Sequence, residues 1–256
     1  MVIKGTKLHE QWKRGKYKPY TDRQLINIIK KAKQYVPEYC RIVRVIRDIP
    51  AESIEAGSKT SNLRQTIEEE MRKKELKCRC IRCREIKNIK LETRNLKLKR
   101  LDYEASGGKE IFLSFDDIKH DKLAALIRLR LRSDLRHLTT NANSDIRFNK
   151  NQNPNREHGW QEVGSRQIEI SPVLQNSAII RELHAYGEAV PLFRFPTSKH
   201  TQHRGLGKLL VKEAEKIAKK EFSARRIAVI SGIGVRGYYA KLGYKLKDTY
   251  MVKNIK

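Results

Sequence analysis

The sequence predicts an α/β fold built on a mixed, mostly antiparallel sheet. Leu126–Leu131 alternates apolar and arginine side chains at period two from Ile127 onward, which indicates a strand with one buried face. Ile227–Ile230 is a short, mostly β-branched run that is typical of a buried strand. Between them, residues 208–220 place leucine, valine, isoleucine and alanine on one face of a helix. Strands that alternate with such a helix favour an α/β arrangement.

A glycine-containing stretch, Gln202–Gly207, separates the apolar run Ile179–Tyr186 from this helix. A strand, a glycine turn and a helix in that order form an anion site, because the free N–H groups of the first helical turn and the helix dipole favour negative charge. The stretch is neither a P-loop nor a dinucleotide fingerprint. Its Gln/Arg-x-x-Gly-x-Gly form resembles the pyrophosphate cradle for coenzyme A in GNAT acetyltransferases. The structural alternative is an ordinary glycine turn at a helix start.

Gly237–Tyr244 predicts a short helix that is closed by Gly243, a residue type favoured at helix C-termini. Its Tyr-Tyr-x-x-x-Gly-Tyr pattern resembles the segment beside the coenzyme in GNAT enzymes, where a tyrosine can protonate the departing thiolate. Tyr238 and Tyr239 are therefore candidate catalytic residues. The alternative is that both tyrosines only pack.

The middle of the chain predicts further strands. Residues 96–101 with 103–106, and residues 110–115, flank a Gly107-Gly108 turn, and together with the strand at 126–131 they form an antiparallel start to the sheet. Residues 139–159 are polar and asparagine-rich, which predicts a surface loop. Residues 168–170 form a candidate short strand before Pro172.

The N-terminal segment predicts a short helix over residues 8–16 and a longer one to Tyr35, which begins at a capping box made by Thr21 and Gln24. The expected apolar face of the longer helix is made by Leu25, Ile28, Ile29 and Ala32. Arg41–Arg47 is an expected strand, and Asn62 is an expected cap for a helix with Leu63, Ile67 and Met71 on one face. Too little sheet is predicted here to stand alone, so residues 1–70 are expected to end a larger domain.

Cys78, Cys80 and Cys83 are spaced closely enough to bind one tetrahedral zinc ion, although a structural zinc site needs a fourth ligand. Cys40, a histidine or a residue of another segment could supply it. An iron–sulfur cluster or free thiols are the alternatives. The flanking residues 71–100 hold 13 basic and 3 acidic side chains, which suits contact with a phosphate backbone.

The chain has 56 basic and 29 acidic residues, a net charge of +27. Residues 1–100 contribute 28 basic and 12 acidic side chains to this excess. Such a balance is the electrostatic footprint of a nucleic-acid binder, with a membrane surface or a generally basic proteome as alternatives. No apolar run is long enough to span a bilayer and no secretory signal is visible, so we expect a soluble, cytoplasmic protein.

Further segments extend the resemblance to one family. They are Glu182–Gly187 with Val190-Pro191, Gln202–Gly207, Ala228–Gly232 and Tyr250–Lys253, and, earlier in the chain, Arg47–Pro50, Asn62–Arg64 and Cys78–Glu85. Together they closely resemble the acetyltransferase half of the catalytic subunit of Elongator. The resemblance covers nearly the whole chain, with residues 132–171 matching least. The chain is therefore expected to be a C-terminal portion of such a protein.

That family joins a radical S-adenosylmethionine domain to a GNAT domain, and it forms the 5-carboxymethyl group on the wobble uridine of tRNA from acetyl-CoA. The resemblance implies that residues 1–75 end the radical SAM-type domain, 76–95 form a cysteine-rich zinc linker and 96–256 form the GNAT acetyltransferase domain. The cysteine motif of the radical cluster does not occur in this sequence. A 4Fe-4S cluster and S-adenosylmethionine are therefore expected only in a missing N-terminal domain.

The resemblance also implies site residues. Acetyl-CoA contacts are expected at Glu182, Leu183, His184, Ala185, Leu206, Gly207, Lys208 and Tyr239, and the cradle adds Gln202 and Gly205. Zinc is expected at Cys78, Cys80 and Cys83. Ala185 stands where the family usually has a larger apolar residue, but backbone contacts there should persist. The expected partners are the anticodon arm of tRNA, stacked on Trp12, Tyr17 and Tyr20, and a second copy or a larger Elongator-like complex.

Two rival functions remain open from the sequence. A lysine acetyltransferase would transfer acetyl groups to a protein without RNA, but no single carboxylate stands out as the base that would deprotonate an amine. An RNA-binding scaffold with a degenerate GNAT domain would bind RNA without acetyl-CoA, and the intact glycine pattern speaks against it.

Overall fold

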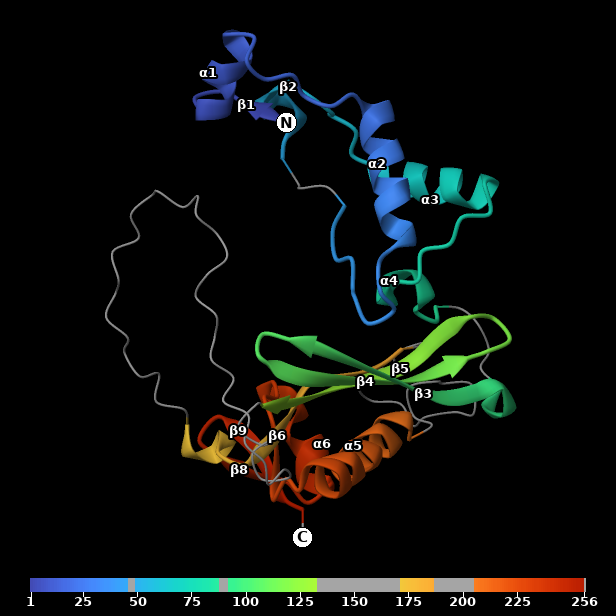
Figure 1. The fold of residues 1–256 in the computed structure, drawn as a ribbon, viewed down its shortest axis with the longest axis vertical. Coiled ribbons are helices and arrows are strands. Elements are labelled where there is room, and N and C mark those ends of the chain that lie inside the picture. The colour runs from blue at the N-terminus through green and yellow to red at the C-terminus, as the bar shows by residue number, and fades with distance from the viewer. Residues whose placement is uncertain (46–48, 88–91, 133–170, 187–204, 256) are drawn as a thin grey trace, which may run out of the picture. The chain divides into compact units, whose positions relative to one another are not determined.

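A computed structural model describes residues 1–45, 49–87, 92–132, 171–186 and 205–255, which fold as two units (Figure 1). Unit 1 contains residues 1–86 with 121–123, and unit 2 contains residues 87–120 with 124–256. The predicted mixed α/β class is confirmed. Within the described ranges, no helix has both the length and the apolar character needed to cross a membrane.

Unit 1 joins a small strand pair to a set of helices. Strands β1 (Val2–Ile3) and β2 (Ile54–Ala56) pair antiparallel. The helices are α1 (Lys7–Lys13), α2 (Asp22–Gln34), α3 (Leu63–Lys73) and α4 (Ile81–Arg84). The predicted capping box is confirmed at the start of α2, because the Thr21 N–H donates to Gln24 Oε1 at 2.9 Å and the Gln24 N–H donates to Thr21 Oγ1 at 3.3 Å.

The predicted buried face of α2 is wrong in part. Ile28 is 48 % exposed and Ala32 is exposed, whereas the buried side chains are Ile26, Lys30 and Lys33. Ile26 packs against the buried face of α3, which is Leu63, Ile67 and Met71 as predicted. The two lysines follow Ile26 at positions i+4 and i+7, so they continue the same stripe of the helix. A polarity pattern alone assigns lysines to the solvent side and therefore selects the wrong stripe.

The predicted strand at Arg41–Arg47 is wrong over its described residues, because residues 41–45 form no strand. Their carbonyl groups have other partners. Arg64 Nη2 donates to the carbonyl oxygens of Ile42 at 3.2 Å and Val43 at 3.3 Å. A guanidinium group takes the place of a neighbouring strand there, which a period-two pattern cannot reveal.

Unit 2 is organised around a seven-stranded sheet with the order β3-β4-β5-β6-β7-β9-β8. Its strands are β3 (Leu96–Ala105), β4 (Gly108–Asp117), β5 (Lys122–Arg132), β6 (Ser177–Ala185), β7 (Arg226–Val229), β8 (Lys245–Lys247) and β9 (Tyr250–Asn254). The β6–β7 pair is parallel, and the pairs β3–β4, β5–β6, β7–β9 and β8–β9 are antiparallel. The sheet is therefore mixed and mostly antiparallel, as predicted, and its first three strands form one edge in chain order.

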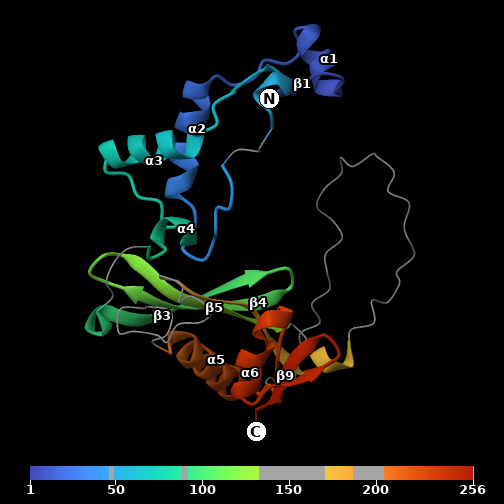
Figure 2. The same cartoon turned by 180° about the vertical axis from the view of Figure 1, so that it is seen from behind.

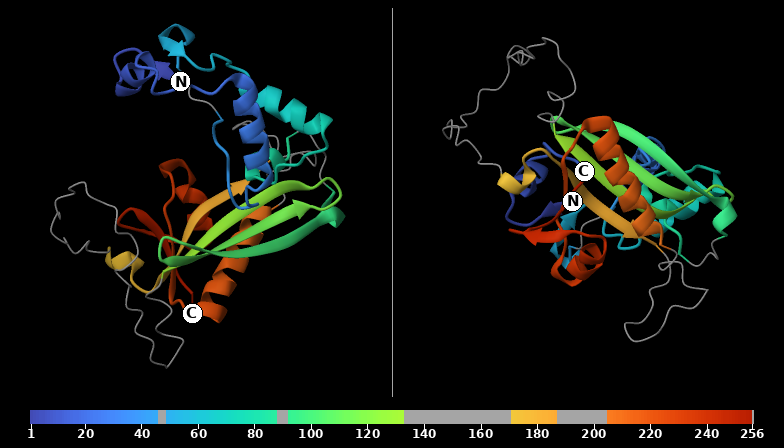
Figure 3. Two further views of the ribbon diagram at one scale, coloured as in Figure 1. Left: turned by 45° about the horizontal axis from the view of Figure 1, so that its top comes forward. Right: turned by 90° about the horizontal axis from the view of Figure 1, so that it is seen from below.

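Helix α5 (Leu206–Phe222) lies along one face of this sheet, where it packs on β4 and β6 (Figure 2, Figure 3). Its buried side chains, among them Leu210, Ala214 and Ile217, form the predicted apolar face. Helix α6 (Arg236–Lys241) has Leu242 as its C-cap and is followed by Gly243, whose φ of +87° is the left-handed conformation that favours glycine. The predicted loop at 139–159 and strand at 168–170 lie outside the described residues.

Candidate functional site

The strands β6 and β7 separate partway along the sheet. Their parallel pairing runs from Ser177↔Arg226 to Ile180↔Val229, where β7 ends. Strand β6 continues to Ala185, paired on its other edge with β5. Among the described residues, the edge of β6 that faces β7 therefore has no strand partner from Arg181 to Ala185. Backbone N–H and C=O groups on such an edge are available to an extended ligand.

Helix α5 begins beside this fork. Gly205 caps the helix with φ of +73°, in the left-handed region, and the first helical hydrogen bond runs from Leu209 N–H to the Gly205 carbonyl at 3.0 Å. The N–H groups of Leu206, Gly207 and Lys208 precede that bond, so they have no carbonyl partner within the helix. The first turn has no acidic residue. These features together suit an anion.

The structure brings Tyr238 and Leu183 to the start of α5. A Cβ atom on Gly207 would lie 2.9 Å from Tyr238 Oη and 3.9 Å from Leu183 Cδ2. Glycine is thus favoured at this position by the close approach of the Tyr238 side chain, not by its backbone conformation. Three predicted residues, from β6, α5 and α6, meet here.

The two candidate tyrosines differ in their surroundings. Tyr238 is 39 % exposed, and burial raises the pKa of its hydroxyl. Tyr239 is 5 % exposed, and burial raises its pKa to about 12. Its ring packs edge-on against Tyr238, with centroids 5.2 Å apart, and against Tyr244, with centroids 5.7 Å apart. Both hydroxyls keep their protons at neutral pH, and that of Tyr238 lies at the start of α5.

A polar pocket of about 360 Å³ lies on β3, β5 and β6, lined by Tyr103, Arg128, Arg181, Glu182 and His184. Arg128 Nε donates to Glu182 Oε2 at 2.5 Å, and its Nη1 donates to Tyr103 Oη at 2.7 Å. His184 Nε2 lies 3.3 Å from Glu182 Oε1. Hydrogen bonds from His184 and from Arg128 lower the pKa of Glu182 to about 2, so this carboxylate stays ionised.

A β-bulge on β6 places consecutive residues in this pocket. Arg128 pairs with Glu182 and Leu129 pairs with Ile180, which leaves Arg181 as the extra residue. Arg181 Nη1 donates to Glu110 Oε1 at 2.6 Å, and Arg130 Nη1 donates to the same oxygen at 2.9 Å. Glu110 is fully buried, so two guanidinium groups compensate its charge.

The predicted coenzyme-binding and catalytic residues therefore lie mainly at two locations. Leu183, Gly207 and Tyr238 meet at the start of α5, while Glu182 and His184 line the polar pocket. Ala185 pairs with Ala125 at the end of β6, and Lys208 is exposed on the first turn of α5. Gln202 lies outside the described residues.

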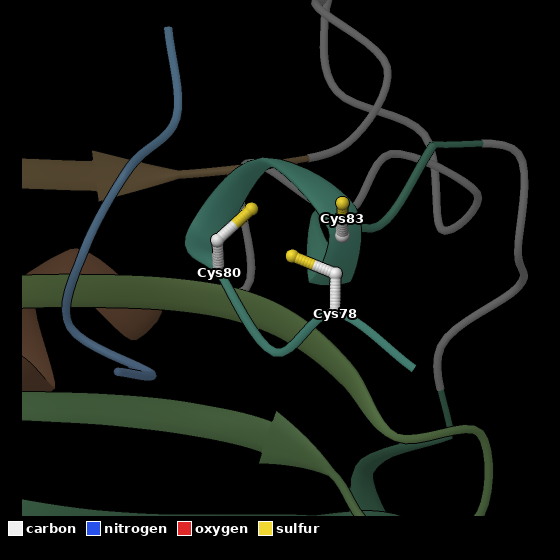
Figure 4. A group of neighbouring side chains, drawn as sticks. All are labelled: Cys78, Cys80 and Cys83. Atoms are coloured by element: carbon white, nitrogen blue, oxygen red, sulfur yellow. The ribbon is translucent and has the colours of Figure 1, made fainter. Parts of the chain in front are cut away.

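The predicted cysteine cluster is assembled in unit 1. The sulfur atoms of Cys78, Cys80 and Cys83 lie within 4.8 Å of one another around the start of α4 (Figure 4). The Cys80 sulfur accepts hydrogen bonds from the thiols of Cys78 and Cys83 and from the backbone N–H groups of Cys83 and Ile42, and these bonds lower its pKa. Hydrogen bonding to the Cys80 sulfur raises the pKa of Cys78, and hydrogen bonding to Cys78 and Cys80 raises the pKa of Cys83. Three thiols held this closely are a donor set for a soft divalent ion.

Arginine side chains fix the loop that carries these cysteines. Arg84 is buried, and it donates to the carbonyl oxygens of Arg79 at 2.9 Å and Glu38 at 3.1 Å. Arg79 in turn pairs with Glu38 at 2.5 Å and with Asp121 at 3.1 Å. Cys40 accepts the Ile81 N–H on its carbonyl oxygen at 2.9 Å, but its thiol is not part of the cluster found among the described residues.

Several site residues were missed from the sequence: Tyr103, Arg128, Arg181 and Glu110 in unit 2, and Lys33 in unit 1. The period-two pattern of β5 does place Arg128 and Arg130 on one face of the strand. It does not give their partners, which lie on β3, β4 and β6, and Glu182 is 54 residues further along the chain.

Comparison with known proteins supports the resemblance found in the sequence. Residues 1–73 match the Radical_SAM C-terminal domain. The chain is 42 % identical to the tRNA uridine(34) acetyltransferase of Methanocaldococcus infernus, over 100 % of this chain and 43 % of that protein. It is 41 % identical to Elongator complex protein 3 of Schizosaccharomyces pombe, over 99 % of this chain and 41 % of that protein.

The human Elongator complex protein 3 is 37 % identical over 100 % of this chain and 42 % of its own length. The chain thus spans about two fifths of the length of these curated relatives. A solved structure of the archaeal Methanocaldococcus infernus Elp3 with an N-terminal deletion matches with a TM-score of 0.76 and 43 % identity, over 99 % of this chain and 53 % of that one.

Proposed function

We propose that this chain is the acetyl-CoA-binding acetyltransferase portion of an enzyme that forms the 5-carboxymethyl group on the wobble uridine of tRNA. The chain is homologous, over its whole length, to tRNA uridine(34) acetyltransferases and to the catalytic subunit of Elongator. Residues 96–256 are its GNAT domain, residues 76–95 its zinc linker, and residues 1–75 the end of its radical SAM-type domain. The radical chemistry, with its S-adenosylmethionine and 4Fe-4S cluster, belongs to the remainder of such an enzyme.

The observation that carries this proposal is the meeting of three elements at one point. The open edge of β6, the glycine-capped start of α5 and the Tyr238 hydroxyl of α6 all border the fork between β6 and β7. An extended ligand with a pyrophosphate group matches this arrangement: hydrogen bonds along a strand edge, then a helix N-terminus for the anion. Exposed apolar side chains at the end of β7 and beyond it, Ile230 and Ile233, add contact surface for an apolar arm.

Acetyl-CoA, when bound, supplies an activated acetyl group as a thioester. The N–H groups of residues 206–208 hold its pyrophosphate, and the edge of β6 from Arg181 to Ala185 orients its arm. Tyr238 is the better candidate for the proton donor, since its hydroxyl is at the start of α5, whereas Tyr239 is buried and its ring packs against Tyr238 and Tyr244. Its raised pKa keeps a proton on Oη for donation to a leaving sulfur.

The cysteine cluster fits zinc as the second expected group. Cys78, Cys80 and Cys83 would supply three thiolate ligands, and the ion would fix the loop between α3 and α4. The basic charge of the chain supports tRNA as the partner, since Lys and Arg side chains gain affinity for RNA by releasing counterions from phosphates.

Acetyl-CoA binding is the first test, measured by isothermal titration with the chain. Release of free thiol is then followed without RNA and with anticodon stem-loops that carry either uridine or cytidine at the wobble position. Release that rises only with the uridine stem-loop supports the proposed function. Transfer to a lysine peptide without RNA would favour a lysine acetyltransferase, and tight RNA binding without coenzyme binding would favour a scaffold.

A further inference from the structure

Helix α2 buries two lysine side chains one turn apart. Lys30 is 5 % exposed and Lys33 is 2 % exposed, and both lie on the stripe that faces the interior of unit 1. An ammonium group is costly to bury unless an opposite charge compensates it. The partner of each lysine therefore indicates why it is there.

Lys30 has an ordinary partner. Its Nζ forms a close ion pair with Glu70 Oε2 of α3, and the other oxygen of that carboxylate lies 3.3 Å from Arg23 Nη1. Lys30 and Glu70 thus form a local ion pair between two helices, and Arg23 remains to pair with Glu70 if Lys30 is replaced.

Lys33 differs in what it contacts. Its nearest carboxylate is that of Glu68, with Nζ and Oε1 4.0 Å apart, and Glu68 is 48 % exposed and also pairs with Arg64 at 3.4 Å. The closer contact is to the cysteine cluster, because Lys33 Nζ donates to Cys83 Sγ at 3.6 Å. The buried charge of Lys33 is therefore directed at a thiol that we assign as a metal ligand.

We propose that Lys33 is the built-in counter-ion of the metal site. The inference rests on the proposed metal site at Cys78, Cys80 and Cys83. Three thiolates that bind a divalent ion leave one net negative charge, and one ammonium group neutralises it. The N–H···S hydrogen bond also withdraws charge from the Cys83 sulfur without competing for the ion, because an ammonium group has no lone pair. Lys33 is thus a positioning residue for the metal site and not a ligand.

A group that hydrogen-bonds to a metal ligand matters for metal affinity, since removing that hydrogen bond typically weakens metal binding by about 10- to 100-fold. The chain offers a matched control, because Lys30 is equally buried, lies on the same helix and contacts no cysteine in the described structure. Lys33→Met and Lys30→Met remove the same charge and keep a similar side-chain length.

The experiment measures Zn²⁺ affinity of the full chain by competition with a chromogenic chelator, and the sulfur-to-metal charge-transfer band of the Co²⁺-loaded chain. We expect K33M to bind Zn²⁺ at least tenfold more weakly and to shift the Co²⁺ band, while K30M stays within twofold of the parent. Parent-like affinity and an unchanged band in K33M would overturn the inference.

A general loss of stability in K33M is separated from this effect by a second comparison. The rise in Tm caused by Zn²⁺ is measured for C83S and for C83S/K33M. If Lys33 acts through the Cys83 sulfur, adding K33M to C83S leaves the Zn²⁺-induced rise in Tm unchanged. If K33M reduces that rise equally in the parent and in C83S, the inference is overturned. A parent chain that binds no Zn²⁺ would reject the metal site itself, an outcome distinct from a parent that binds with K33M unaffected.

Discussion

Replacing Gly207 by alanine gives the sharpest test of the fork at the start of α5. The added Cβ would lie 2.9 Å from Tyr238 Oη, a separation that real Cβ contacts do not show, so the tyrosine must move. The next atoms, Tyr238 Cζ at 3.8 Å and Leu183 Cδ2 at 3.9 Å, are at ordinary contact distance. The perturbation is therefore confined to one hydroxyl group and to the space above the first helical turn.

Two opposing terms set the change in folding free energy. Overpacking costs about 1–3 kcal/mol, whereas glycine to alanine inside a helix gains about 1 kcal/mol. We expect G207A to be destabilised by between about 0 and 2 kcal/mol and to stay folded. Coenzyme affinity should fall at least tenfold, about 1.4 kcal/mol, because the new methyl group adds bulk to the first turn, whose N–H groups we assign to the pyrophosphate.

The double variant G207A/Y238F separates the two effects. Without the hydroxyl, the nearest neighbour of the new methyl group is the ring carbon at 3.8 Å, so stability should return to the parent value or exceed it. Coenzyme affinity should remain low, because the methyl group still covers the first turn. Thermal unfolding and isothermal titration with acetyl-CoA measure the two quantities.

Gly237→Ala is the matched control, since it lies in α6 and a Cβ there would meet nothing within 4 Å. It should leave coenzyme affinity unchanged. Full coenzyme affinity in G207A would refute the proposed anion site at the start of α5. If removal of the Tyr238 hydroxyl does not change the stability of G207A, the predicted clash between that hydroxyl and the new methyl group is refuted.

Three further predictions concern Glu182, the tyrosine pair and Arg181. Glu182, with a pKa of about 2 against an ordinary 4.5, adds stability above pH 4.5 that is lost as the pH falls toward 2. The stability gap between the parent and E182Q, roughly 1–3 kcal/mol at pH 7, should therefore close on acidification, and a gap independent of pH would contradict this. Y238F should slow thiol release at least tenfold and Y239F less than threefold in a kinetic assay; the reverse order would reassign the proton donor. R181M should lower acetyl-CoA affinity several-fold in titrations. Its Tm should change little, because Glu110 keeps its hydrogen bond from Arg130. Parent-like affinity would show that Arg181 does not shape the fork.

The parts of this fold that could be predicted from sequence are those set by local rules. The capping box at Thr21 depends on residues three apart, and the burial of Leu129 and Leu131 depends on a strand alternation. Gly205 could be identified because glycine tolerates the left-handed backbone conformation in which a chain can turn into an amphipathic helix. These features need no knowledge of what lies across the fold.

The parts that could not be predicted depend on partners distant in the chain. Lys33 belongs to the interior only because α3 and the cysteine loop supply its partners, and Cys83 is 50 residues away. Residues 41–45 resemble a strand but give carbonyl groups to Arg64, 22 residues from Ile42. The order of the tyrosines is a further case, because a pattern names both but only packing shows which hydroxyl meets Gly207.

The position of Arg181 explains why the sheet opens where it does. On one edge of β6, pairing with β7 ends at Ile180↔Val229; on the other edge, the register with β5 breaks between Ile180 and Glu182. Both interruptions fall at the same residue, so the strand is free to turn away from β7 without straining the ladder to β5. The buried carboxylate of Glu110 holds the bulged arginine in place. In a regular strand Glu182 would lie on the same face as Ile180, and Leu183 on the opposite face. The extra residue reverses this order. Leu183 therefore lies against the start of α5, while Glu182 lines the polar pocket.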